Sequence, residues 1–438
     1  MIKNEKPNII WFMIDSLRNE FLYNFGCEFA KQTFLDNLLS ECVSFTNCRS
    51  VAPYTIASLT AKMTGCYPSV NYIDGWLKKN PLKALNPECL TIIDMFKYHG
   101  YTTTYIASSS SCAYISPDSF DNYLCCNGSD NFPVDIVVGK NPSFTIMLID
   151  IIHDACCEHI GKFDSRMYVS NVEKVSGVVE EYYNRMKSDN DLVLITSDHG
   201  VRVIDELENT AYSKEFVTGR FLTEKTTRCS FNLKWKKHFE PCRISQMVRS
   251  VDIFPTLMDV LGWEYPLLDG VSLLPFITKK VDLPVIKYAY TLTGWSAMDP
   301  KTPGLWAIID TEGYKLVVSK KYRGIKKRKI IKELFDLNSD PNEEKDVLSL
   351  YPDKAQELYL ELKAKLMHVR DIKALYAQKP FDYQSYLAFR YSNRSVNSLS
   401  IANNIIIENW QKKVRRKFLI NFYVNKFKML IRYYLIDK

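Results

Sequence analysis

The chain has 438 residues, of which 46% are hydrophobic and 24% charged, the composition of an ordinary folded protein with more than one domain. Its formal net charge is +7, but residues 411–438 hold nine Lys and Arg against the single acid Asp437 and so carry +8. The remainder therefore carries about −1, which gives nucleic-acid binding no support. The start, Met1–Lys6, is polar, and no run of about 18 uncharged apolar residues is present, so the sequence predicts neither a signal peptide nor a spanning helix.

Residues 1–275 alternate apolar strands with helical patterns, which predicts a mostly parallel sheet flanked by helices. The predicted strands are 8–14, 102–107, 144–150 and 191–196, and the predicted helices are 29–40, 56–64, 168–187 and 245–261. In the next unit, 276–369, the runs 305–310 and 314–318 predict an antiparallel hairpin, and 352–367 predicts an amphipathic helix. Residues 370–438 form a third, basic and aromatic-rich unit that is predicted to be helical.

Two of the predicted strands end in side chains that bind metals. The run that starts at Asn8 ends at Asp15, and the run that starts at Leu192 ends at Asp198 and His199. Continuous apolarity is typical of parallel strands buried on both faces, whose carboxyl ends meet at one edge of the sheet. Asp and His are ordinary ligands of divalent metals, so the three side chains are candidate metal ligands. A helix cap for Asp15 and a plain turn for the Asp-His-Gly segment are the alternatives.

Five motifs share their order and spacing with one enzyme family. They are Ile14–Arg18, Met63–Pro68, Thr196–Gly200, Ser250–Leu257 and Glu333–Glu343. From about residue 7 to about residue 365 the chain resembles the sulfatase branch of the alkaline phosphatase superfamily. The resemblance implies an α/β sandwich with a mostly parallel central sheet flanked by helices, plus a smaller C-terminal α+β domain with a four-stranded antiparallel sheet. It also implies a hydrolase or transferase acting on a sulfate or phosphate ester.

The resemblance places Thr55 at the position of the family's nucleophile. Sulfatases have Cys or Ser there, within a Cys/Ser-x-Pro-x-Arg motif, and oxidise that residue to formylglycine. This chain reads Thr55-Ile56-Ala57-Ser58-Leu59, so the Pro and the Arg are missing and Thr has no route to the aldehyde. Thr55 instead resembles the metal-bound threonine of the superfamily's phosphodiesterases and phosphoryl transferases, and it would complete the metal shell. A simple helix cap is the alternative role.

Two further residues are candidate substrate contacts. His153 follows the strand predicted at 144–150, where many sulfatases have a histidine that contacts the substrate anion, although the neighbouring prolines of that motif are absent. It is either a substrate contact or general acid, or a structural histidine. Arg220 falls where two-zinc members have a metal-binding histidine and sulfatases a lysine. Since Arg suits a phosphate or sulfate oxygen pair and not a metal, one metal is expected; a surface arginine is the alternative.

The functional expectation is a metal-dependent hydrolase or transferase of a phosphate or sulfate ester, with a substrate that is a glycan or a lipid-linked intermediate. His199 favours zinc or manganese over calcium or magnesium. The tail from 409 to 438 interleaves basic and aromatic residues, which is typical of segments that bind anionic membranes, although a helix packed on the body is equally compatible. Twelve cysteines without a CxxC pair predict reduced thiols and a cytoplasmic protein, for which the basic tail would allow a peripheral position at the inner membrane face. The contrasting hypothesis is a non-catalytic relative that binds an anionic ligand or a partner.

Overall fold

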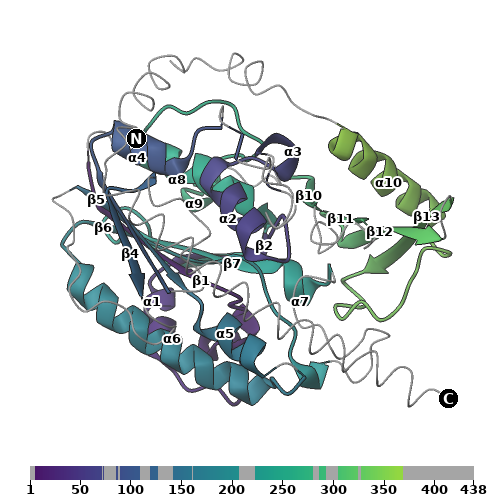
Figure 1. The fold of residues 1–438 in the computed structure, drawn as a ribbon, viewed down its shortest axis with the longest axis horizontal. Coiled ribbons are helices and arrows are strands. Elements are labelled where there is room, and N and C mark those ends of the chain that lie inside the picture. Colours follow the sequence, from purple (N-terminus) through teal and green to yellow (C-terminus); the bar gives the residue numbers. More distant parts are fainter. Residues whose placement is uncertain are drawn as a thin grey trace, which may run out of the picture.

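The structure is a computed structural model that describes residues 5–71, 73, 85–86, 89–108, 119–126, 142–159, 161–206, 222–279, 286–292, 304–323 and 327–367. Two sheets lie side by side in it (Figure 1). The strands of the larger sheet are β1 (Asn8–Ile14), β2 (Val43–Arg49), β3 (Thr102–Ser108), β4 (Asn122–Cys126), β5 (Ser143–Ile149), β6 (Asp191–Ser197), β7 (Arg228–Lys234), β8 (Cys242–Ile244) and β9 (Val248–Arg249). The smaller sheet contains β10 (Tyr288–Thr291), β11 (Gly304–Asp310), β12 (Tyr314–Arg323) and β13 (Lys327–Asp336).

The larger sheet has the order β4-β3-β5-β1-β6-β7-β2-β8, with β9 paired to β2. Its pairs from β4 to β6 are parallel, whereas β7 runs antiparallel to both β6 and β2. The prediction of a mostly parallel sheet is therefore confirmed. The four predicted strands match β1, β3, β5 and β6 within one residue at each end.

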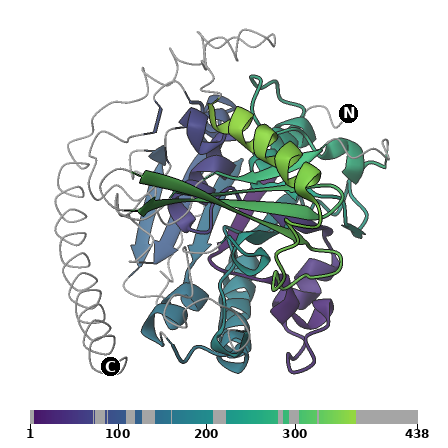
Figure 2. The ribbon, with the colours of Figure 1, turned by 90° about the vertical axis from the view of Figure 1, so that its right-hand side faces the viewer.

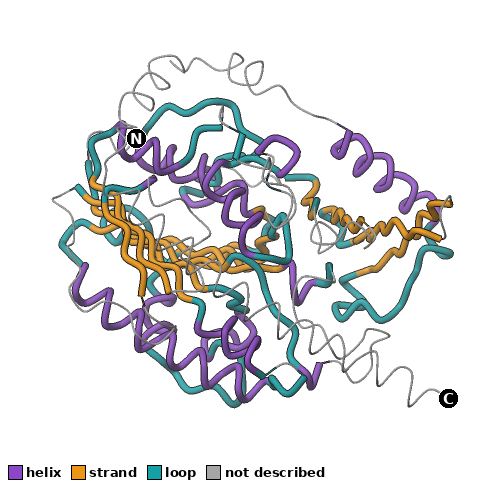
Figure 3. Tube along the Cα trace, in the orientation of Figure 1, coloured by secondary structure: helices purple, strands orange, loops and turns teal. Residues whose placement is uncertain are grey.

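Helices cover both faces of the larger sheet (Figure 3). The odd-numbered residues of β1, such as Trp11, pack in one core with α2 (Thr55–Thr64), α4 (Ile92–Tyr98) and α8 (Ile253–Leu261). The even-numbered residues, such as Phe12, pack in a second core on the opposite face. The helices of that face are α1 (Phe34–Ser40), α5 (Ile151–Glu158) and α6 (Ser165–Met186). The side chains of β1 thus contribute alternately to the two cores, because successive side chains of a strand point to opposite faces of the sheet.

Short helices complete the larger unit: α3 (Pro68–Asn71), α7 (Glu224–Thr227) and α9 (Leu274–Ile277). The C-terminal helix α10 (Pro352–Met367) lies across the smaller sheet (Figure 2). All pairs in the smaller sheet are antiparallel, and β11 and β12 form the predicted hairpin. The resemblance therefore gave the right secondary structure for this region.

A buried ionic cluster joins the two sheets. Lys315 of β12 places its Nζ 3.0 Å from Glu224 Oε1 and 2.9 Å from Glu343 Oε1. Glu224 also pairs with Arg49 at the end of β2, and its backbone amide donates to Glu343 Oε2. The glutamate of the Asp-Pro-x-Glu motif therefore holds the C-terminal sheet against the strand that leads to Thr55.

Two predicted helices are shorter than expected. The helix expected at 29–40 begins only at Phe34, because Thr33 and Asp36 form a reciprocal capping box that fixes its start. The helix expected at 245–261 begins at Ile253, after a 3-10 turn, Ser250–Asp252. A longer helix would place Pro255 in its interior, where the ring clashes with an earlier carbonyl; in α8 the proline lies in the first turn.

Within the described ranges, ten cysteines are free thiols, in keeping with the expectation from the sequence. Cys125 departs from that expectation because it takes part in a disulfide. Among the helices of the described ranges, none combines the length and the apolar character that crossing a bilayer requires. The tail and Arg220 lie outside the described residues.

Candidate active site

The register of the central strands brings the predicted metal ligands together. In the parallel pair of β1 and β6, Ile14 lies opposite Ser197, so the next residues, Asp15 and Asp198, leave the sheet side by side. Both carboxylates are fully buried, and His199 is nearly so. One ligand atom from each of these three residues lies within 4.8 Å of the others. The structure thus assembles the predicted set from segments more than 180 residues apart.

Thr55 reaches the same point as the first residue of α2. Its Oγ1 donates to Asp15 Oδ2 at 3.0 Å and lies 3.4 Å from His199 Nε2. The helix cap is Tyr54, and it makes no side-chain capping bond. Since the Thr55 hydroxyl points to Asp15 and not to a backbone amide, the alternative role as a simple cap does not fit the structure.

The donor atoms at the site are arranged for a cation. His199 Nδ1 lies 2.9 Å from the carbonyl oxygen of Gly200, which can only accept, so Nδ1 carries a proton; when the ring is neutral, Nε2 is the atom with a lone pair for a metal. Nε2 lies 3.2 Å from Asp198 Oδ2, a buried oxygen without a hydrogen-bond partner among the described residues. Two lone-pair atoms so close together, with Thr55 Oγ1 alongside, fit a shared divalent metal ion.

The electrostatics of the two carboxylates differ. Burial and the neighbouring Asp198 raise the pKa of Asp15 from 3.8 to about 6. Burial also opposes ionisation of Asp198, but His199 and the buried Lys62 outweigh it and hold the pKa of Asp198 below its usual range. Two buried carboxylates at one point, of which Asp15 has a raised pKa, are suited to bind a cation.

The turn after β1 holds a strained residue. Ser16 has φ of 65°, in the left-handed region that a residue with a side chain seldom adopts. This conformation lets its amide donate to Asp198 Oδ1 at 3.0 Å and its hydroxyl to Asp15 Oδ1 at 2.8 Å. Tyr168 of α6 fixes the turn by donating to the Ser16 carbonyl at 2.7 Å. Ser16 is therefore a hydrogen-bond partner that orients both metal-ligand carboxylates.

A close backbone approach holds the loop after β6 in place. A Cβ on Gly200 would lie 2.2 Å from the carbonyl oxygen of Lys225, so only glycine fits beside α7. Arg18, from the first motif, reaches across to the same loop and donates to the Val201 carbonyl at 2.8 Å. It also pairs with Glu206 at 2.7 Å. Gly200 and Arg18, which both belong to the motifs shared with the family, thus fix the loop that carries Asp198 and His199.

Two buried polar residues of α2 were not predicted from the sequence. Lys62 is completely buried, and its Nζ donates to Ser58 Oγ at 2.7 Å and to the Asp198 carbonyl at 3.2 Å. Ser58 donates to the same carbonyl at 2.6 Å. Together with Thr55 these residues occupy positions i, i+3 and i+7 of one helix face. The available signal was the recurrence of polar residues at this spacing within a helix of which nearly every residue is buried.

Asp150 is a further carboxylate that the sequence reasoning missed. It follows β5 as Asp15 follows β1, and the two strands are parallel neighbours. It is fully buried and accepts a hydrogen bond from Ser108 at the end of β3. The repeated pattern of an apolar strand followed by Asp was the signal that pointed to it.

His153 lies at the same edge of the sheet but does not contact the metal-ligand cluster directly in any described hydrogen bond. It belongs to α5, where its Nδ1 lies 3.3 Å from Asp154 Oδ1 and its Nε2 3.6 Å from Cys157 Sγ. Burial lowers the pKa of His153, but Cys157 and Asp15 outweigh it, so the pKa lies well above its ordinary value. Its role as a substrate contact stays a prediction.

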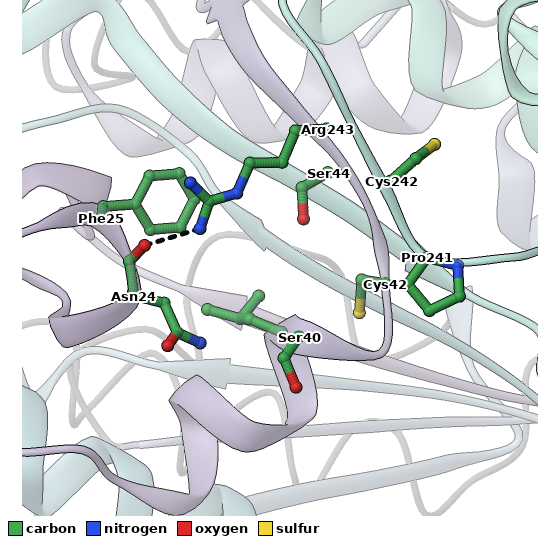
Figure 4. A pocket seen from close by; sticks show the side chains of 9 residues that line it. Asn24, Phe25, Ser40, Cys42, Ser44, Pro241, Cys242 and Arg243 are labelled. Atoms are coloured by element: carbon green, nitrogen blue, oxygen red, sulfur yellow. Dashed lines mark hydrogen bonds between the residues drawn. The ribbon is translucent and has the colours of Figure 1, made fainter.

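A pocket elsewhere on the protein does not belong to this site. It lies beside Cys42 and Ser44 at the start of β2, whereas Thr55 follows the end of that strand (Figure 4). Its charged residue, Arg243, donates to the Asn24 carbonyl at 2.6 Å and lies over the ring of Phe25. The arginine thus serves to hold a surface loop.

An α/β sandwich with two Asp, a His and a Thr at the carboxyl edge of its sheet is the arrangement expected for the sulfatase branch of the alkaline phosphatase superfamily. Comparison with protein families agrees: residues 7–134 match the family described as "Sulfatase", and residues 213–372 match "N-sulphoglucosamine sulphohydrolase, C-terminal". The chain belongs to the sulfatase family of the alkaline phosphatase superfamily. Enzymes of this fold generally bind a divalent metal, and the cluster described above is the candidate site for it.

Curated relatives include both sulfatases and a phosphoryl transferase. The chain is 24% identical over 320 residues to an ulvan-active sulfatase of Formosa agariphila, covering 66% of this chain and 60% of that protein. It is 22% identical over 279 residues to GPI ethanolamine phosphate transferase 2 of Debaryomyces hansenii, covering 59% of this chain and 31% of that protein. The chain thus spans less than two thirds of the length of these relatives.

Solved structures share the fold. One is a protein in complex with D-glucosamine-2-N,6-O-disulfate, described as its substrate; it has a TM-score of 0.64 and 17% identity and covers 86% of this chain and 99% of that chain. Another is the phosphonate monoester hydrolase of Agrobacterium radiobacter, with a TM-score of 0.60, 14% identity, and coverage of 82% and 96%. At these identities the likeness establishes the fold alone.

Proposed function

We propose that the protein is a metal-dependent hydrolase or transferase of phosphate esters, with Thr55 as its nucleophile. The observation that carries the proposal is the position of the Thr55 hydroxyl, 3.0 Å from Asp15 Oδ2 and 3.4 Å from His199 Nε2. A hydroxyl is a weak nucleophile until a nearby cation lowers its pKa, and the start of a ten-residue helix favours negative charge.

The identity of residue 55 favours phosphate over sulfate. The sulfatases that this chain resembles use formylglycine made from Cys or Ser, and Thr offers no such route. The relatives include a phosphate transferase and a phosphonate hydrolase as well as sulfatases, so the family accommodates phosphorus chemistry. Sulfate esters are the second substrate class of the proposal.

The donor set indicates one zinc or manganese ion held by Asp15, Asp198, His199 and Thr55. Two carboxylates, an imidazole nitrogen and a hydroxyl are a mixed nitrogen and oxygen set, which suits these metals better than calcium or magnesium. A divalent ion bound there would act as a Lewis acid toward the threonine oxygen and the ester.

The protein's own residues then position the reaction. Asp15 orients the Thr55 hydroxyl through the 3.0 Å hydrogen bond, and the Ser16 amide and hydroxyl orient the two carboxylates. Ser58 and Lys62 fix the backbone of Asp198, because both side chains donate hydrogen bonds to its carbonyl oxygen. Arg220 is proposed to bind the non-bridging oxygens of the ester, and His153 to contact the substrate or the leaving group.

The substrate is proposed to be an ester on a glycan or on a lipid-linked intermediate. Support comes from relatives that are described as acting on ulvan or on a glucosamine disulfate, and from a transferase named for a GPI-linked reaction. The +8 charge of residues 411–438 supports recruitment to an anionic membrane surface, with the cytoplasmic face as the proposed location.

Substrate profiling of purified, metal-loaded protein tests the function. An aryl phosphate, an aryl phosphodiester, an aryl phosphonate monoester and an aryl sulfate are compared at matched leaving groups. Phosphorus esters are expected to turn over, Thr55→Ala to remove turnover and Thr55→Ser to retain part of it, because only a hydroxyl is needed.

Thr60→Ala is the matched control on the same helix, since Thr60 Oγ1 only donates to the Ile56 carbonyl at 2.7 Å. Full activity of Thr55→Ala would exclude Thr55 as the nucleophile. A protein that binds metal and aryl phosphate but turns over no ester would instead be the non-catalytic relative.

A further inference from the structure

One exposed thiol contacts a histidine that is itself in contact with a carboxylate. Cys157 and His153 occupy positions i+4 and i of α5, and Cys157 Sγ lies 3.6 Å from His153 Nε2. The other ring nitrogen, Nδ1, lies 3.3 Å from Asp154 Oδ1. Among the free cysteines of the described ranges, Cys157 is the one that is exposed. The three side chains form a thiol, imidazole and carboxylate series on a single helix.

Such a series activates a thiol. The carboxylate orients the ring through Nδ1, so Nε2 faces the sulfur and is placed to accept its proton when the thiol reacts. Burial lowers the pKa of His153, but the neighbouring Cys157 and Asp15 outweigh it and raise that pKa, which agrees with the contact between ring and sulfur. Two buried thiols are disfavoured as thiolates, because burial raises the pKa of both Cys42 and Cys126 to about 12.

We propose that Cys157 is a site of covalent modification by peroxide and other small electrophiles, activated by His153 and Asp154. The thiol is linked to the candidate active site through His153. Helix α5 begins two residues after β5, the parallel neighbour of β1, and His153 and Asp15 are close enough to influence each other's ionisation. A group added to the sulfur therefore changes the charge and position of His153 beside the metal ligands.

The reaction with hydrogen peroxide balances without a further reactant. The thiolate sulfur attacks one peroxide oxygen, an S–O bond forms and the O–O bond breaks. Sulfur loses two electrons and becomes a sulfenic acid, and the leaving hydroxide takes the proton from the His153 imidazolium to give water. A second thiol can then condense with the sulfenic acid to give a disulfide and water, and a further thiol can return Cys157 to its reduced form by thiol–disulfide exchange.

Competitive alkylation measures the activation with the other cysteines as internal standards. The intact protein is treated with a limiting amount of iodoacetamide at neutral pH, and each cysteine peptide is quantified by mass spectrometry over time. Cys157 is expected to react at least about tenfold faster than Cys242, which is partly exposed and has no imidazole partner in the described structure.

Two variants separate activation from exposure. His153→Gln is expected to reduce the Cys157 rate at least about tenfold, and Asp154→Asn to reduce it by a smaller factor, with the Cys242 rate unchanged in both. Circular dichroism confirms that each variant is folded. Equal rates for Cys157 and Cys242, or a Cys157 rate that does not respond to His153→Gln, would overturn the proposal.

The effect on the active site rests on the proposed function and is tested separately. Peroxide is expected to lower turnover of the parent protein with the same time course as sulfenic acid formation at Cys157, detected by dimedone labelling. Cys157→Ser, which keeps basal turnover, is expected to resist this loss. Because alkylation and dimedone labelling need no turnover, the modification site is decided even for a protein without esterase activity. Equal peroxide sensitivity of parent and Cys157→Ser would refute the link to the active site.

Discussion

Replacing Asp15 with Asn is expected to stabilise the metal-free protein at neutral pH while removing its metal site. In the folded chain, burial and Asp198 raise the pKa of Asp15 from 3.8 to about 6. At about 1.36 kcal/mol per pKa unit, keeping this carboxylate ionised at pH 7 costs about 3 kcal/mol of folding free energy. Asn loses one of the two hydroxyl hydrogen bonds, from Ser16 or Thr55, at about 1 kcal/mol. The expected net gain is about 2 kcal/mol.

The sign of the pH dependence follows from the same shift. Because the folded-state pKa is raised, the folded protein binds more protons than the unfolded chain between 3.8 and about 6, and stability falls as the pH rises through that window. The advantage of Asp15→Asn is therefore complete above pH 6 and shrinks between about 6 and 3.8. Below that window the variant is expected to be less stable than the parent, since only the lost hydrogen bond remains.

Urea unfolding of EDTA-dialysed parent and variant at pH 7 and pH 5 measures this difference. Added zinc or manganese is expected to stabilise the parent and not the variant. Asp36→Asn is the matched control: its two carboxylate oxygens accept backbone amides of Asn24 and Thr33, so its replacement is expected to destabilise at both pH values. If metal-free Asp15→Asn is less stable than the parent at pH 7, ionisation of the buried Asp15 carboxylate does not destabilise the folded protein, and the prediction is wrong.

Three other outcomes are expected. Asp198→Ala should remove stoichiometric metal, and an unchanged metal content by elemental analysis would contradict the ligand assignment. Gly200→Ala should disrupt the site, because its Cβ would meet the Lys225 carbonyl. Gly177→Ala, in the interior of α6 with open space around it, should instead raise the stability measured by thermal unfolding by about 0.5–1 kcal/mol. Similar effects of the two substitutions on stability would contradict the close approach at Gly200. Deleting residues 409–438 should abolish salt-sensitive binding to anionic vesicles and leave turnover of a small ester intact. Full-length protein that ignores such vesicles in co-sedimentation would remove the support for membrane recruitment.

The sequence by itself determined the parts of the fold that local patterns encode. Uninterrupted apolar runs predicted β1 and β6 with the carboxylates that follow them, and the short runs 305–310 and 314–318 on either side of residues 311–313 predicted the β11–β12 hairpin. These features depend on residues close together in the chain, so periodicity and turn chemistry suffice to find them. Even the start of α1 was encoded locally, in the Thr33–Asp36 capping box, although the prediction overlooked it.

Only the tertiary structure decided which side chains meet. The pairing of β1 with β6 places Asp15 beside Asp198, and the packing of α2 on the sheet brings Lys62 beneath Asp198, 136 residues away in the chain. Likewise, the contact between His153 and the Cys157 thiol depends on rotamers that spacing alone does not fix. Strand register and helix packing are set by the whole core, because each buried side chain must fill the space left by residues distant in sequence. Local sequence patterns therefore predict candidate site residues, whereas the tertiary structure determines which of them are in contact.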